Sequence, residues 1–234
     1  MSVTTRRAGR QSPSRRGRLV QFLLIGVVVA FIAAIAGVQI LGSDQPATEN
    51  ATTTTTGPLE GAAAELAELL ELRQTQTYHA RYEGQSGESS TVVIETWQDG
   101  AGDVRQDQVL RSGEQGAHLV SLVADGQEVR CTQIATDEWR CRRAATGELS
   151  GADPVAAVRA RLADGEVTAR NVDVDGQPAR CFELTAQGET SELCVRVETG
   201  IPVRISGGTT ELRLVVLEDT VDPSVFEPPA PVEG

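Results

Sequence analysis

The sequence predicts an α+β domain, in which one strongly curved antiparallel sheet carries two helices on its concave side, preceded by one transmembrane helix. Three observations predict this class. Residues 19–41 contain no charged side chain. From Tyr78 onward, apolar residues recur at every second position in many short segments separated by Gly and Asp. Two segments only have helical spacing, and two helices cannot cover both faces of a flat sheet of this length, so the sheet must curve.

The uncharged segment 19–41 predicts a membrane-spanning helix of about 34 Å. Six Arg residues lie within residues 1–18 and Asp44 follows the segment. Because positive flanks stay in the cytoplasm, residues 1–18 are predicted to be a cytoplasmic basic tail, and the C-terminal domain extracytoplasmic. A cleaved signal peptide is the alternative, since Ala34-Ile35-Ala36 fits a cleavage site. The apolar run is longer than such signals usually are, which favours a single-pass protein of the cell membrane.

The charge balance outside the basic tail excludes one class of partner. Beyond residue 18 the chain holds 15 Arg against 33 acidic residues, and no Lys. Binding to nucleic acid requires a positive surface that displaces counterions. We therefore expect no nucleic-acid partner.

A linker and a helix precede the strands. Residues 42–57 are rich in Thr and hold no large apolar side chain that could form a core, which indicates a linker. Asn50-Ala51-Thr52 matches a glycosylation acceptor, and the alternative of an unmodified spacer stays open. Pro58 suits the first turn of a helix. Leu59, Ala63, Leu66 and Leu70 then follow at helical spacing, so a helix should begin the domain at 58–230, with 231–234 as a tail.

The remaining pattern is that of strands, turns and one further helix. The dipeptides Asp99-Gly100, Asp125-Gly126 and Asp175-Gly176 are hairpin-turn signals. Asp153 and Pro154 match the N-cap and first position of a second helix, which Gly165 should end. The predicted strands are 78–84, 90–98, 103–111, 117–124, 127–134, 138–143, 166–174, 177–185, 189–198, 202–206 and 210–218.

The four Cys residues are predicted to form two disulfides, each across one hairpin. A two-residue turn at Gln187-Gly188 sets Cys181 opposite Cys194 at a non-hydrogen-bonded site, where Cα atoms approach to about 4.5 Å. The hairpin around residues 135–137 likewise sets Cys131 opposite Cys141. Disulfides suit an oxidising extracytoplasmic compartment. Zinc sites use shorter Cys spacings, so no metal is expected.

No motif predicts catalysis. A nucleophile elbow, a P-loop, an HExxH sequence and a CxxC pair are all missing from the sequence. His79 and His118 fall on or beside strands without a partner that the sequence identifies. We therefore expect a non-enzymatic protein without a cofactor.

Four segments together resemble a known family. They are LRQTQTYHARYE (72–83), GQPARCFEL (176–184), ELCVRVETGIPVRI (192–205) and VDPSVFEPPAP (221–231). Over residues 58–230 the pattern resembles the LolA/LolB-like superfamily of lipoprotein carriers, which includes the LppX/LprG lipid carriers and the N-terminal domain of RseB. The resemblance implies an incomplete β-barrel that wraps helices and holds acyl chains in an apolar cavity.

Two functions follow as expectations from this resemblance. The first is an anchored binding domain that holds a lipid or a lipidated ligand, such as a lipoprotein, in its concave apolar cavity. The second is a protein-interaction or sensor-regulatory module of the cell envelope without a small ligand. An open apolar cavity would favour the first function, and a filled core would favour the second. The candidate lining residues for the first are Phe182, Leu184, Leu193, Val195, Leu212 and Leu214.

Overall fold

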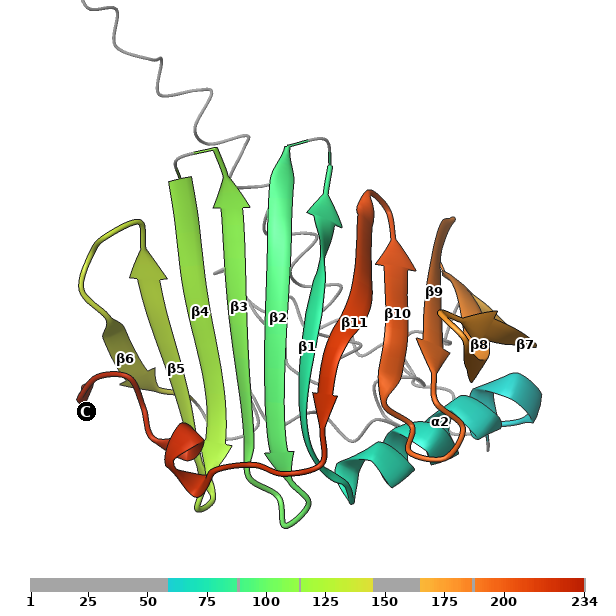
Figure 1. Ribbon diagram of the computed structural model, residues 1–234, viewed down its shortest axis with the longest axis horizontal. Coiled ribbons are helices and arrows are strands. Elements are labelled where there is room, and N and C mark those ends of the chain that lie inside the picture. Colours follow the sequence, from blue (N-terminus) through green and yellow to red (C-terminus); the bar gives the residue numbers. More distant parts are fainter. Residues whose placement is uncertain (1–58, 88, 114, 145–164, 187, 234) are drawn as a thin grey trace, which may run out of the picture.

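The described part of the chain forms a single open sheet with one α-helix and a short 3-10 helix (Figure 1). The computed structural model describes residues 59–87, 89–113, 115–144, 165–186 and 188–233. The helices are α2 (Gly61–Gln74) and η1 (Pro223–Phe226). The strands are β1 (Thr77–Ser86), β2 (Ser90–Asp99), β3 (Val104–Ser112), β4 (Gln115–Ala124), β5 (Gln127–Ile134), β6 (Arg140–Arg143), β7 (Gly165–Val174), β8 (Gln177–Ala186), β9 (Glu189–Val195), β10 (Pro202–Gly207), β11 (Thr210–Glu218) and β12 (Val232–Glu233).

The predicted fold class is wrong in its helices and in its purely antiparallel sheet. The described residues hold one sheet of twelve strands and one α-helix, not two helices on a concave side. The segment predicted as the second helix lies outside the described residues, except that Gly165 begins β7. The sheet is also mixed, because β12 pairs in parallel with β6. The predicted membrane segment 19–41 and linker 42–57 lie outside the described residues as well.

Two meanders make up the sheet. The strand order is β12-β6-β5-β4-β3-β2-β1-β11-β10-β9-β8-β7. Strands β1 to β6 follow one another as neighbours, and so do β7 to β11. The pairing of β1 with β11, for example Tyr82 opposite Leu214, joins the two meanders. The edges of the sheet are therefore β7 at one end and the two-residue β12 at the other (Figure 1).

The register assigns each strand residue to one of two faces, because residues directly opposite each other in an antiparallel pair lie on the same face. One row runs through Ala80, Thr96, Gln106, Ser121 and Arg130. Its face is called the α2 face, because Ala80 belongs to the core that α2 covers. The neighbouring row lies on the other face, here called the strap face, and runs through His79, Trp97, Arg105, Leu122 and Val129.

The core under α2 lies at the β7 end of the sheet. Leu66, Leu69 and Leu70 of α2 pack against Tyr78, Ala80 and Tyr82 of β1 and against apolar residues of β2 and β8 to β11. Burial raises the pKa of both tyrosines, which identifies them as core residues.

Three polar or backbone contacts fix where α2 lies. Gln98 on β2 donates from Nε2 to the carbonyl oxygens of Arg73 and Gln74 at 2.9 and 2.7 Å, at the C-terminal end of the helix. Arg180 on β8 donates to both carboxylate oxygens of Glu65, each at 2.8 Å. Gly200 packs its Cα against the helix backbone, since a Cβ there would lie 1.8 Å from the Leu69 carbonyl oxygen.

A second core lies on the strap face at the β6 end. It contains Val120, Leu122, Val129 and the disulfide Cys131–Cys141. Phe226, Ala230 and Val232 of the C-terminal segment 219–233, here called the strap, pack against it.

A third, smaller cluster lies on the strap face at the β7 end and contains Val174, Ala179, Val203 and the disulfide Cys181–Cys194. The α2 face of β3 and β4 carries buried polar residues such as Gln106 and Ser121.

Candidate functional site

The six residues predicted to line a cavity lie together in the core under α2. Five of them are at most 7% exposed, and Leu214 is partly buried against the same cluster. The residues come from three strands, β8, β9 and β11, as the sequence pattern indicated. None of them lines the cleft described below. They pack against one another and α2 as core residues.

Both predicted disulfides are present with the predicted pairing. Cys131 lies opposite Cys141 with 4.0 Å between the Cα atoms, and Cys181 lies opposite Cys194 with 3.9 Å. The second pair also approaches Glu192 closely enough to form a grouping of metal-ligand atoms. Because each of its sulfurs is bonded to the other, this grouping offers no thiolate to a metal ion.

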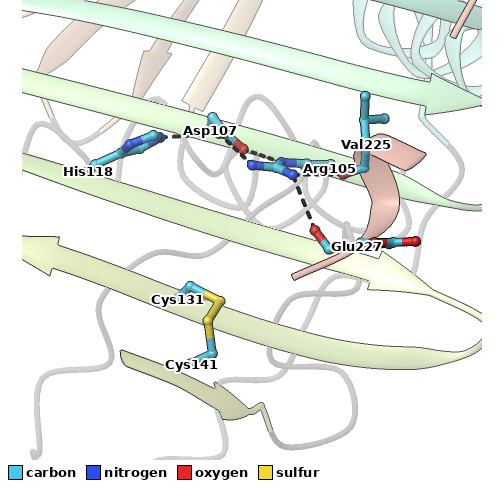
Figure 2. A network of polar contacts seen from close by, with 7 residues as sticks. All are labelled: Arg105, Asp107, His118, Cys131, Cys141, Val225 and Glu227. Carbon is cyan, nitrogen blue, oxygen red and sulfur yellow. Dashed lines mark hydrogen bonds and ion pairs between the residues drawn. A yellow bond between two sulfur atoms is a disulfide. The ribbon is translucent and has the colours of Figure 1, made fainter. Parts of the chain in front are cut away.

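A part-buried polar network lies on the strap face of β3 and β4 (Figure 2). Arg105 donates from Nε and Nη2 to the two carboxylate oxygens of Asp107 at 2.6 and 2.9 Å. Nε2 of His118 lies 3.1 Å from Oδ2 of the same carboxylate. Burial alone would raise the pKa of Asp107, but the hydrogen bonds from His118 and Arg105 lower it overall. The carboxylate is therefore ionised and fully engaged at neutral pH.

The network attaches the strap to the sheet. Arg105 also donates from Nη1 to the carbonyl oxygen of Val225 at 2.7 Å, with that of Glu227 at 3.3 Å (Figure 2). Asp222 accepts from the backbone N–H of Ser224 and so caps η1, which lowers the pKa of Asp222. Because each side-chain nitrogen of Arg105 and both carboxylate oxygens of Asp107 have a structural partner, the network holds the strap in place.

A polar cleft of about 770 Å³ lies at the other half of the strap face, where the strap does not reach. Its lining comes from the ends of β1, β8, β9, β10 and β11 and from the turns that connect them. The lining residues are Glu83, Gly84, Gln85, Gly87, Glu183, Thr190, Ser191, Glu192, Ser206, Gly207, Gly208, Thr209, Thr210, Glu211 and Arg213. We call it the acidic cleft, because its lining residues include four carboxylates and one guanidinium. Neither histidine lines it.

The carboxylates of the acidic cleft differ in their neutralisation. Glu192 accepts from both Arg170 and Arg204, and Glu211 lies 2.9 Å from Arg213. Glu83 pairs with Arg81, whereas Glu183 has no ion-pair partner within the described residues. Three of the four carboxylates therefore have an Arg partner, and Glu183 is the one that can pair with an incoming cation.

The sequence analysis missed both the network and the cleft. The network can be inferred once the strand register is known. Asp107 lies directly opposite Val120, and His118 is two residues from Val120 on the same face of β4. For the cleft, the run of Ser, Gly and Thr at 206–210 marks a turn with small side chains, but the carboxylates come from strands far apart in the sequence.

Comparisons with known proteins do not assign a family. No protein-family model and no curated protein sequence matches the chain. The crystal structure of MucB matches with a TM-score of 0.46 at 18% identity, over 72% of this chain and 63% of the MucB chain. MucB in complex with MucA(peri) matches with a TM-score of 0.45 at 17% identity, over 73% of this chain and 60% of that chain. The structure of PNGF-II in space group P21 gives 0.36 at 9% identity, over 68% and 31%.

This chain thus spans about three fifths of the MucB chain. Because all three TM-scores lie below 0.5, the resemblance to the LolA/LolB-like superfamily stays a prediction.

Proposed function

We propose that the chain is a membrane-anchored, extracytoplasmic binding module without catalytic activity, which holds a positively charged segment of another cell-envelope protein in the acidic cleft. The observation that carries this proposal is the contrast between two sites. The six apolar residues expected to line a lipid cavity pack in the core under α2. The cleft is polar, and the carboxylate of Glu183 lies in it without an ion-pair partner among the described residues.

The size and chemistry of the cleft support a peptide segment as its occupant. A volume of about 770 Å³ lies in the range of ligand pockets and exceeds what one side chain fills. Glu183 lies in the cleft without an ion-pair partner among the described residues, so an incoming Arg or Lys can pair with it. Complementary charge of this kind mainly raises the association rate and the specificity of a complex.

The anchor and the compartment are further parts of the proposal. Within the described residues no helix has the length and apolar character needed to cross a membrane. The anchor is therefore proposed from the sequence of residues 19–41. The two disulfides support an oxidising compartment outside the cytoplasm.

The test measures binding of a fluorescent Arg- and Gly-rich peptide to the full chain in detergent micelles. We expect salt-sensitive binding that weakens about tenfold in the double variant Glu83→Gln, Glu183→Gln. Glu138→Gln is the matched control, because Glu138 is exposed in the connection between β5 and β6 and lies outside the cleft. Equal affinity of the double variant and the control would contradict the proposal.

Mass spectrometry of the same protein provides the decisive comparison with the lipid hypothesis. The full chain, purified from membranes of a lipid-rich bacterial host, is weighed under native and then denaturing conditions. We expect no acyl lipid to leave on denaturation. A lipid released in near-stoichiometric amount would overturn the proposal and favour the lipid-binding domain.

A further inference from the structure

The two edges of the sheet differ in how they end. At one edge, the two-residue β12 of the strap covers β6. At the other edge, β7 pairs with β8 over ten residues without a register shift, and with no other strand in the described parts of the chain. Natural sheets protect long edges with Pro, bulges or very short strands. Strand β7 has no Pro or bulge and is ten residues long, and the charges of Glu166 and Arg170, which could repel a second strand, have opposite signs.

The turn before β8 determines which backbone groups of β7 point outward. Asp175 and Gly176 both have positive φ, 53° and 80°, as a two-residue hairpin turn of type I′ requires. The flanking pair Val174 and Gln177 is then hydrogen-bonded, and hydrogen-bonded pairs alternate along the hairpin from there. The N–H and C=O groups of Val167, Ala169 and Asn171 consequently point away from β8, toward the free edge.

The side chains of β7 divide by face in the same alternation. Val167 and Ala169 lie on the α2 face, half-buried against the core under α2. Glu166, Thr168 and Arg170 lie exposed on the strap face. The edge thus offers outward hydrogen-bonding groups, an apolar row on one face and two opposite charges on the other.

We infer that β7 pairs antiparallel with β7 of a second copy of this chain, about a two-fold axis at Thr168. Val167 of each copy then lies opposite Ala169 of the other, in a hydrogen-bonded pair that extends the apolar row. Glu166 of each copy lies opposite Arg170 of the other, in a non-hydrogen-bonded pair where side chains approach most closely. The twelve-stranded sheet continues through the interface.

The charged side chains of β7 and the division of its residues between the two faces select this register. A shift by one residue would set outward groups opposite inward ones and exchange the two faces. Centring the axis on Arg170 would place two guanidinium groups directly opposite each other, which is unfavourable. Centring it on Ala169 would place Glu166 opposite Val172 and form no charge pair. Only the axis at Thr168 pairs the outward backbone groups of the two strands, extends the apolar row and places Glu166 opposite Arg170.

The inference is independent of the proposed function, because no residue of β7 lines the acidic cleft. The first experiment introduces Thr168→Cys into the full chain in detergent micelles and applies mild oxidation. The two cysteines at the axis should form an intermolecular disulfide, seen as a dimer on a non-reducing gel, because the Cα separation of about 4.5 Å in such a pair allows it. Thr185→Cys, on β8 one strand inward, should stay monomeric. No crosslink with Thr168→Cys, or equal crosslinking of both variants, would overturn the inference.

The second experiment exchanges the charges and measures the sedimentation mass. Glu166→Arg and Arg170→Glu should each lower the dimer fraction, and the double variant should restore it. Arg170 also pairs with Glu192 in its own chain, and the double variant does not restore that pair. Recovery would therefore report the contact between copies. Circular dichroism spectra of all variants exclude misfolding, and a double variant that stays as dissociated as the single ones would contradict the register and with it the inference.

Discussion

The main cores at the two ends of the sheet lie on opposite faces and under different covers. At the β7 end, α2 covers the core and the carbonyl oxygen of Leu69 approaches Gly200. At the β6 end, the strap covers a smaller core, and Arg105 attaches it through carbonyl oxygens. A helix satisfies its own backbone groups internally, whereas a strap depends on the sheet to satisfy them. The helix end should therefore respond mainly to changes in packing, and the strap end to changes in polar contacts.

The largest effect is expected at the helix end, from Gly200→Ala. Gly200 has a φ of 69°, and its added Cβ would lie 1.8 Å from the Leu69 carbonyl oxygen. The variant should lower the free energy of unfolding by about 3–5 kcal/mol, since overpacking adds to left-handed strain. Urea unfolding measures this loss.

The matched control for this packing effect is Gly126→Ala. Gly126 has nearly the same φ of 70°, and nothing lies within 4 Å of its added Cβ. Only the conformational cost of about 1 kcal/mol should remain. Equal losses in the two variants would show that α2 does not depend on this close contact.

The next largest effect is expected at the strap end, from Arg105→Met. The variant removes the donors to Val225 and Glu227 and leaves Asp107, whose side chain is 11% exposed, without its guanidinium partner. We expect a loss of about 2–3 kcal/mol. Hydrogen exchange should rise at residues 222–233, while α2 keeps its protection.

Arg213→Met is the control for the loss of a guanidinium. Arg213 and Glu211 are about half exposed, and the free energy of unfolding should change by less than about 0.5 kcal/mol. Faster exchange in α2 than in the strap of the Arg105→Met protein would contradict the division into two ends.

Local patterns in the sequence are sufficient to predict the hairpins. The turns Asp125-Gly126 and Asp175-Gly176 have the positive φ values that their sequence indicated. Counting outward from the turns at Gln187-Gly188 and at residues 135–137 gives both Cys pairings. The contact of β1 with β11 and the attachment of the strap to Arg105 join residues more than a hundred positions apart. No local periodicity encodes such pairings, so the acidic cleft and the second core could not be predicted.

The predicted lining residues illustrate the same limit. Period-two alternation correctly grouped Phe182 with Leu193, which lie opposite each other on one face. Alternation does not reveal what covers that face. Leu66, Leu69 and Leu70 of α2 fill the space above these residues, and this depends on the position of the helix across the sheet.

A smaller effect at the strap end should appear on acidification. The pKa of Asp107 is lowered in the folded protein relative to about 3.9 in the unfolded chain. Its contribution to stability is therefore complete above about pH 4, and is lost as the pH falls through the lower folded-state pKa. Urea unfolding between about pH 6 and about pH 3 should show a shallower decline for Asp107→Asn than for the wild type. Identical declines would mean that other carboxylates determine the acid sensitivity of the strap.

The smallest effect is expected for the ion pair between α2 and β8. Glu65→Gln removes the charge that pairs with Arg180, and the two side chains are 41% and 23% exposed. The carboxylate raises the pKa of Arg180, which is already charged at every working pH, so the variant should cost only about 0.5 kcal/mol in urea unfolding. Moderate salt should remove most of that difference, because exposed pairs are screened. A loss above about 2 kcal/mol that persists in salt would mean that polar contacts, and not packing, position α2, and the two ends of the sheet would then be stabilised in the same way.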